Sequence, residues 1–119
     1  GCRLRECWFE PTFHKYAGQL CSGVQIHTDD PAYNHETFQP WRLQALAFKA
    51  LRTEFPDYPL WRNFPYEYEV DRLAIDVING SSLLREWVDD AQALPEDLES
   101  ITHSDEKSWE EERLAFLLY

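Results

Sequence analysis

The sequence predicts a single α+β domain in which a small mixed or antiparallel sheet of about three or more strands packs against about four helices. A chain of 119 residues has the length of one domain. Segments with strand-like alternation occur both before and after a segment with helical periodicity, which is typical of the α+β class. The five Trp, six Tyr and seven Phe can fill a compact core without disulfides.

Three segments are expected to form strands: residues 2–13, 24–28 and 66–70. The first is rich in aromatic and other β-compatible residues. The second alternates, with Val24, Ile26 and Thr28 on one side and Gln25 and His27 on the other. This pattern indicates a half-buried strand whose second face carries hydrogen-bonding side chains.

Apolar residues recur at helical spacing between Trp41 and Phe55, which predicts the longest helix. Pro40 suits its first turn and Pro56 ends it. The further expected helices are one capped by Ser81 or Ser82 that runs to about Gln92, a short one from Pro95, and a final one capped by Ser104.

The formal charge of −11 excludes the basic surface that nucleic acid binding requires. Eleven Asp or Glu lie between Glu86 and Glu112, against one basic residue, Lys107. This acidic segment indicates a solvated face, with an acidic docking surface as the alternative. No apolar run approaches the ~20 residues needed for a membrane span.

Three cysteines, Cys2, Cys7 and Cys21, are too few for a dense disulfide framework, and a disulfide between two would leave one free. His14, Cys21 and His27 offer three metal ligands, with Cys7 as a fourth, but no zinc spacing such as Cys-x2-Cys is present. We therefore expect no metal and no other cofactor. A Cys21 nucleophile with a histidine base is likewise unsupported by any motif.

The densest polar stretch, residues 9–18 and 21–27, contains two His, a Lys, a Tyr, a Glu, a Gln and a Cys around a strand–loop–strand turn. Because binding residues gather on loops held by rigid elements, this stretch is the candidate site. The alternative is an ordinary polar connection between strands.

Carboxylates raise the question of a glycosidase, which generally needs two Asp or Glu flanking the scissile bond. Glu67, Glu69 and Asp76 lie near aromatic residues, so a small complete hydrolase is one hypothesis. The alternative is a strand that buries Tyr66 and Tyr68 and solvates its acids.

The run Pro-Thr-Phe-His-Lys-Tyr-Ala-Gly from Pro11 to Gly18, followed by Gly-Val-Gln-Ile-His from Gly23 to His27, resembles the C-terminal domain of the bacterial exo-β-N-acetylmuramidase family. Later landmarks agree in order: Phe38-Gln-Pro40, Pro65-Tyr-Glu-Tyr68, Ile75-Asp76, Gly80-Ser81 and the terminal Leu117-Leu-Tyr119. The resemblance covers nearly the whole chain. The family was long treated as a domain of unknown function.

The resemblance implies an exported, periplasmic or extracellular, two-domain enzyme that removes N-acetylmuramic acid from peptidoglycan fragments of the cell wall. A Rossmann-like N-terminal domain, absent from this chain, carries the catalytic carboxylate, and the cleft lies between the domains. Residues 1–119 then correspond to the second domain. Its partners are the N-terminal catalytic domain and muramic-acid-containing fragments, and the chain alone is expected to be inactive. A non-catalytic module that binds a sugar, peptide or protein is the alternative.

By this resemblance and by residue chemistry, five side chains are expected to bind substrate in the cleft: His14, Lys15, Tyr16, Gln25 and His27. Lys15 could pair with the lactyl carboxylate that distinguishes muramic acid. The imidazole and amide groups could hydrogen-bond acetamido or hydroxyl groups. No catalytic residue is expected in this chain.

Overall fold

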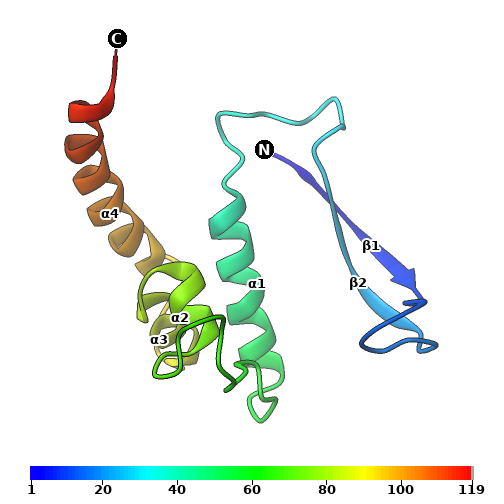
Figure 1. Cartoon of the computed structure of the whole chain (residues 1–119). Helices are drawn as coiled ribbons and strands as arrows, with labels where there is room; N and C mark the ends of the chain where they lie inside the picture. Colours follow the sequence, from blue (N-terminus) through cyan, green and yellow to red (C-terminus); the bar gives the residue numbers. More distant parts are fainter. Residues whose placement is uncertain (119) are drawn as a thin grey trace. The chain divides into compact units, whose positions relative to one another are not determined.

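The computed structural model describes residues 1–118 and confirms the α+β class (Figure 1). The chain divides into two compact units, Gly1–Pro40 and Trp41–Tyr119. The first contains the sheet and the second the helices. The single domain over residues 1–119 stays a prediction.

The sheet of the first unit is one antiparallel hairpin of strands β1, Arg3–Phe9, and β2, Cys21–His27. Arg3 pairs with His27 and Phe9 with Cys21. Among residues 1–118 these are the two strands, so the expected number of three or more was too high. The first strand is also shorter than expected because the chain leaves the ladder after Phe9 and makes a local turn, in which the Gly18 amide donates to the Pro11 carbonyl at 3.0 Å.

The alternation expected around residue 25 is confirmed by the register, because residues paired across an antiparallel ladder lie on the same face. Gln25 and His27 share one face, and Val24 and Ile26 lie on the other. The expectation that this strand is half-buried was wrong within its own unit. Val24 is 62% and Ile26 47% exposed, since a two-stranded hairpin has no second layer of its own.

The second unit begins with α1, Pro40–Glu54, which confirms the expected long helix. The other helices are α2, Ala74–Asn79; α3, Leu83–Asp89; α4, Asp97–Arg113; and the 3-10 turn η1, Leu114–Phe116. Gly80 ends α2 with a left-handed φ of 86°, a conformation that costs glycine little. No helix among residues 1–118 is long and apolar enough to cross a membrane.

Two boundary predictions in the second unit were wrong. The two helices expected from Pro95 and after Ser104 are one continuous helix, α4, which begins at Asp97. Ser104 lies within this helix and does not cap a second helix. Ser82 does precede α3, but its hydroxyl makes no capping hydrogen bond.

The core of the second unit is small. Its buried side chains are Ala45, Leu84, Trp87, Val88 and Leu98. Partly buried residues pack around them, and Phe48 and Trp61 meet edge-on with ring centroids 5.4 Å apart. Because so few side chains are fully buried, polar contacts between the helices contribute to holding them together.

Lys49 of α1 is the most connected of these polar groups. Its ammonium donates to the carbonyls of Trp87, Val88 and Asp90, and lies 5.1 Å from the centre of the Trp87 ring. Carbonyls in the last turn of a helix have no partner within the helix. Lys49 therefore satisfies the C-terminal end of α3 and places a positive charge at the negative end of its dipole.

Asp76 of α2 is 8% exposed and is paired with Arg85 of α3. The guanidinium donates three hydrogen bonds to the carboxylate, at 2.9, 3.1 and 2.9 Å. The two short helices are thus fixed to each other by a bidentate, largely buried pair, whose geometry is the strongest that a carboxylate and an arginine can form.

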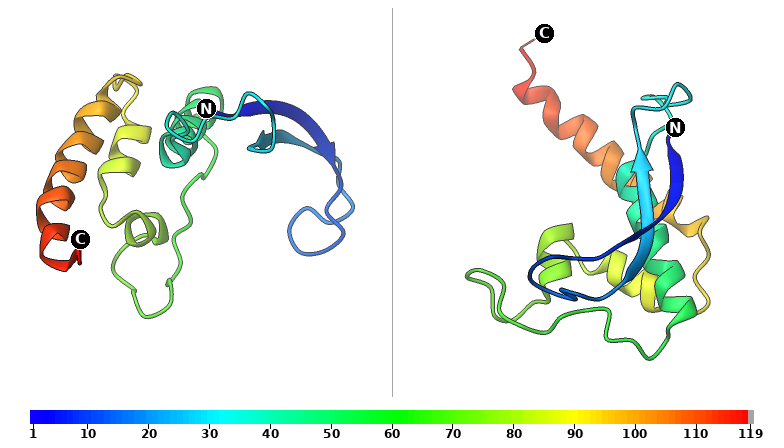
Figure 2. Two further views of the ribbon diagram at one scale, coloured as in Figure 1. Left: turned by 90° about the horizontal axis from the view of Figure 1, so that it is seen from above. Right: turned by 90° about the vertical axis from the view of Figure 1, so that its right-hand side faces the viewer.

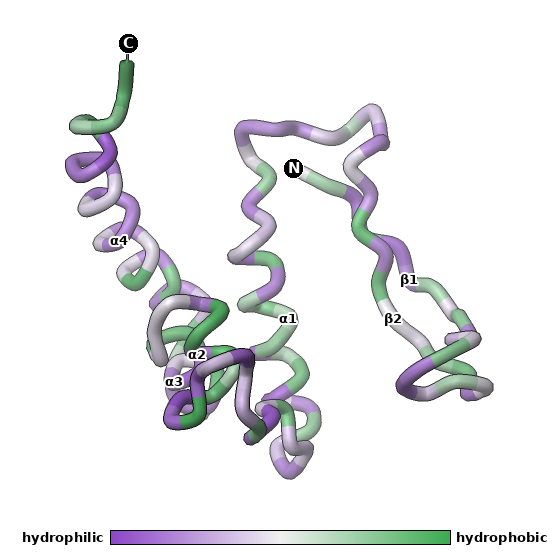
Figure 3. Tube along the Cα trace, viewed as in Figure 1, coloured by the Kyte–Doolittle hydropathy of each residue, from purple (hydrophilic) through white to green (hydrophobic). Residues whose placement is uncertain are grey.

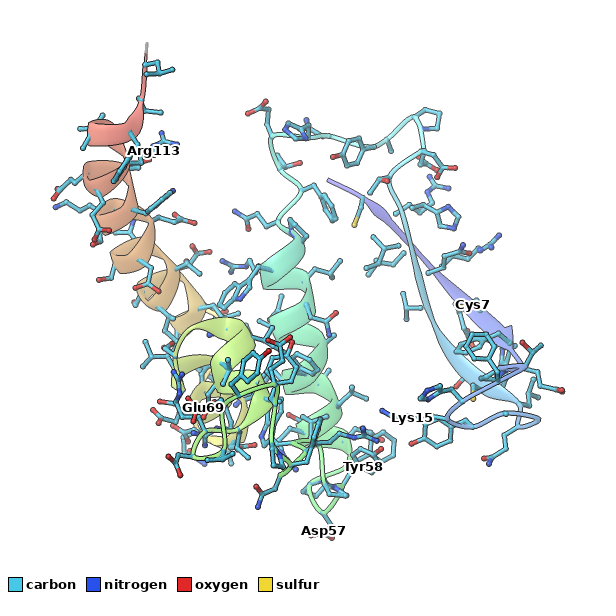
Figure 4. The ribbon with its side chains drawn as sticks, viewed as in Figure 1. Cys7, Lys15, Asp57, Tyr58, Glu69 and Arg113 are labelled. Atoms are coloured by element: carbon cyan, nitrogen blue, oxygen red, sulfur yellow. The ribbon has the colours of Figure 1, made fainter. Side chains whose placement is uncertain are left out.

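The strand expected at residues 66–70 was wrong. Tyr66 and Glu69 exchange two backbone hydrogen bonds of 3.0 Å across a two-residue reversal, with Glu67 at a left-handed φ of 53°. The Glu69 carboxylate, labelled in Figure 4, accepts hydrogen bonds from the Asp71 amide and from Arg72. The alternating Tyr and Glu residues therefore form a turn that the Glu69 side chain stabilises. Tyr68, at the tip of this turn, is fully exposed.

The C-terminal half of α4 extends away from α3, as Figures 1 and 2 show. Every described residue from 103 to 118 is exposed. The hydropathy trace of Figure 3 turns apolar at this end, where Leu114, Phe116 and Leu118 lie in solvent. This helix is supported by tertiary packing only in its first turns, around Leu98 and Ile101.

Replacing Lys49 by Met keeps the aliphatic stem but leaves the α3 carbonyls without their donor. We expect the free energy of unfolding to fall by about 2–3 kcal/mol, since hydrogen bonds to a charged group are worth ~1.5–3 kcal/mol. Urea denaturation followed by circular dichroism measures this loss. Lys107→Met, on the exposed part of α4, is the matched control and should stay within about 0.5 kcal/mol of the unsubstituted protein. Equal losses in the two variants would contradict the role of Lys49.

The hydrogen bond from the Asp71 amide, followed by that from Arg72, lowers the pKa of Glu69. A lowered pKa in the folded state means that the contribution of this carboxylate to the turn is present above its ordinary pKa of about 4.3 and is lost as pH falls through the lowered value. Carbon-detected NMR titration should place Glu69 below its ordinary value, and Arg72→Gln should raise it. A pKa above the ordinary value would disprove the anchored turn.

Candidate functional site

Three of the five predicted site residues, His14, Lys15 and Tyr16, lie in the loop that joins β1 to β2 (Figure 4). His14 and Tyr16 have left-handed φ values of 67° and 59°, and Gly18 follows at 73°. For bulky residues this conformation is strained by about 1–3 kcal/mol each. The Gln19 amide donates to the Tyr16 carbonyl at 3.0 Å, which helps to hold the loop.

The other two predicted residues, Gln25 and His27, lie on one face of β2 at the open end of the hairpin. Arg5 is opposite Gln25 and donates a hydrogen bond of 2.6 Å to its Oε1. His27 Nδ1 lies 3.2 Å from Asp29 Oδ1. This hydrogen bond is the main reason that the pKa of Asp29 is lowered.

A hollow of about 440 Å³ opens beside this strand face, lined by Arg3, Leu4, Arg5, His27 and Asp30. Arg3 pairs with Asp30 at 3.1 Å, while the Arg5 contact is to a neutral amide, so Arg5 is the arginine of this lining that has no carboxylate partner among residues 1–118. Nε2 of His27 is buried and has no hydrogen-bond partner among residues 1–118. A buried polar atom without a partner is rare, which marks the site for a ligand group or water.

The structure thus separates the predicted residues into two sets. From Cys21 to His27 the strand is about 20 Å long, at roughly 3.3 Å per residue. His14, Lys15 and Tyr16 lie beyond one end, and His27 lies at the other. Gln25 and His27 are brought together, and the loop residues are brought together, but no single sugar ring is long enough to contact both sets.

Arg3 and Arg5 belong to this strand face and were missed in the sequence. Their signal was available, because they alternate with Leu4 and Glu6 and therefore point to one side of the first strand. What the sequence lacked was the register, which places that side next to Gln25 and His27.

Metal chemistry has no support in the geometry. Among the described residues 1–118, no three His, Cys, Asp or Glu side chains converge closely enough to hold an ion. The Cys21 thiol donates to the carbonyl of Gln19 at 3.6 Å. Cys2, Cys7 and Cys21 are all free thiols.

Of the three carboxylates considered for a complete hydrolase, Asp76 and Glu69 have structural roles. Asp76 is bound by Arg85 and buried. The pKa of Glu69 is lowered, as is that of Asp29, and a general acid needs the opposite shift. Neither of these groups is therefore suited to protonate a leaving group.

Comparison with known proteins gives one result. A family model described as the C-terminal part of exo-beta-N-acetylmuramidase NamZ matches residues 1–119, the whole length of the chain. No curated protein and no solved structure gave a significant match. The chain therefore belongs to the family of C-terminal domains of the exo-β-N-acetylmuramidase NamZ.

Proposed function

We propose that this domain supplies one wall of the substrate groove of a peptidoglycan-cleaving exo-β-N-acetylmuramidase and that an N-terminal catalytic domain supplies the proton donor. Family membership supports the association with such a glycosidase. The observation that carries the groove is the strand face of Arg3, Arg5, Gln25 and His27, in a chain of net charge −11. Both arginines and the histidine line the hollow beside it.

The chemistry of that face suits an acidic sugar. Muramic acid carries a lactyl carboxylate, and a guanidinium pairs with a carboxylate through two parallel hydrogen bonds. Arg5 is the better placed of the two arginines, because its contact to Gln25 is uncharged and is easily exchanged. The amide of Gln25 can then bind acetamido or hydroxyl groups of the same sugar. Nε2 of His27, which is buried, can do so only after its ring turns toward the hollow.

The hairpin loop extends the groove along the substrate. Lys15 lies between two residues in strained conformations, and such strain persists mainly where function requires it. Since this loop lies beyond the far end of β2, His14, Lys15 and Tyr16 would contact a different part of a peptidoglycan fragment. The proposed ligand is consequently a fragment longer than one monosaccharide, in an exported compartment of a bacterial cell.

The first test is activity. We expect the 119-residue chain to release no sugar from a chromogenic N-acetylmuramic acid glycoside, because the principal protonation step needs a general acid from the other domain. Adding the separately produced catalytic domain should restore turnover. Turnover by the pure chain alone would refute the division of roles.

The second test is binding at the arginine face. We expect Arg3→Gln combined with Arg5→Gln to weaken the binding of an N-acetylmuramic acid disaccharide by at least about tenfold, because charge-assisted hydrogen bonds are lost. Calorimetric titration measures the change. N-acetylglucosamine, which lacks the lactyl group, should bind both proteins equally.

One further variant is a control for that titration, and a second tests the groove with a longer ligand. Arg62→Gln, in the second unit, should leave binding unchanged. Lys15→Ala combined with His27→Ala should weaken the binding of a longer muropeptide. Unchanged muropeptide affinity in this last variant would contradict the groove.

A further inference from the structure

Two consecutive aspartates follow β2, and each of them contacts one residue of the pair at the open end of the hairpin. Arg3 and His27 are directly opposite each other in the register. Asp30 forms an ion pair with Arg3, with Oδ2 3.1 Å from Nε, and Oδ1 of Asp29 lies 3.2 Å from Nδ1 of His27. The proposed function uses Arg3 and His27 but gives no role to Asp29.

The two aspartates differ in how firmly they are held. The Asp30 side chain is only 20% exposed and also accepts a hydrogen bond of 2.8 Å from the Ala32 amide, so a local turn fixes it. The Asp29 side chain is 86% exposed, so it can move into solvent at little cost. The contact to Arg3 is therefore a fixed part of the fold, whereas the contact to His27 can be released.

Asp29 determines which ring nitrogen of His27 carries the proton. The hydrogen bond with His27 is the main cause of the lowered pKa of Asp29, so this carboxylate is ionised at neutral pH and can only accept. Nδ1 of His27 must therefore be the donor in this pair. In a neutral imidazole the other nitrogen, Nε2, then has no proton and carries a lone pair.

This lone pair lacks a donor. Nε2 is buried and has no hydrogen-bond partner within residues 1–118, and an unsatisfied buried polar atom costs free energy. The ring gains the hydrogen bond to Asp29 in the same position, which offsets part of that cost. One ring position thus combines a hydrogen bond that can be released with a nitrogen that is better satisfied elsewhere.

We propose that Asp29 is a positioning residue that holds the imidazole of His27 in this inward position, and that a sugar entering the hollow releases the ring. The inference rests on the proposed function, because it concerns the same strand face. On release the ring turns toward the hollow, and Nε2 accepts a hydrogen bond from a hydroxyl or acetamido N–H of the sugar. Because only molecules with a released ring can make this contact, the Asp29–His27 hydrogen bond lowers the apparent affinity.

The first measurement uses the ligand-free 119-residue chain and the NMR shifts of its imidazole nitrogens, assigned with His27→Ala. At a pH of about 8.5, where histidine side chains are ordinarily neutral, we expect His27 to be the Nδ1–H tautomer. Asp29→Ala should shift it toward the Nε2–H tautomer, because the acceptor at Nδ1 is lost. Asp30→Asn removes the same charge from the next residue and should leave the tautomer unchanged. An Nε2–H tautomer in the unsubstituted chain, or an unchanged tautomer in Asp29→Ala, would overturn the proposal.

The second measurement is calorimetric titration with an N-acetylmuramic acid disaccharide. Asp29→Ala should strengthen binding by about three- to tenfold, the range for losing one hydrogen bond that opposes binding. Loss of an acidic group also favours an anionic ligand by itself, so Asp29→Ala is repeated in the His27→Ala background, where only this electrostatic part of the gain remains.

The outcomes separate this proposal from the proposed function. Equal gains in the two backgrounds, or weaker binding by Asp29→Ala alone, would overturn the release of His27 while leaving the groove in place. Absence of disaccharide binding in every protein would refute the proposed function and the release step together. The tautomer of His27 is measured without any sugar, so that result decides the role of Asp29 in holding the ring whether or not the groove exists.

Discussion

The helical unit depends on the contact between the Lys49 ammonium and the carbonyls at the end of α3, which have no partner within their own helix. Five buried side chains are a small core, and a short helix such as α3 is not stable without tertiary support. Lys49 supplies donors, charge and a contact to the Trp87 ring at the same point. Arg52 of α1 and Trp61, which follows α1 in the chain, bind Asp89 in the same last turn of α3.

Much of this architecture could be predicted from the sequence. Periodicity and the flanking prolines gave α1 almost to the residue, and alternation gave the faces of β2. The turn at Tyr66–Glu69 could not be predicted in this way, because a Tyr-Glu-Tyr-Glu alternation fits a strand equally well. What decides it is the Glu69 carboxylate, whose hydrogen bonds to Asp71 and Arg72 favour the reversal.

For the candidate site, residue chemistry and family resemblance selected five residues, which the structure places in two separate groups. Gln25 and His27 do share one strand face, but Arg5 and Arg3, which lie opposite them, come 20 and 24 positions earlier in the chain. Register across a hairpin depends on the length and conformation of its loop. The loop residues His14 and Tyr16 are strained in a way that composition does not reveal.

The exposed second half of α4 has a consequence for how the molecule loses structure. Beyond Thr102 each turn is held mainly by its own backbone hydrogen bonds, and cooperative units with few buried contacts open at the lowest free energy. Amide protons should therefore exchange with solvent along a gradient, slowest beside Leu98 and fastest toward Arg113. Opening would begin at that end and would reach the contacts between Lys49 and the end of α3 last.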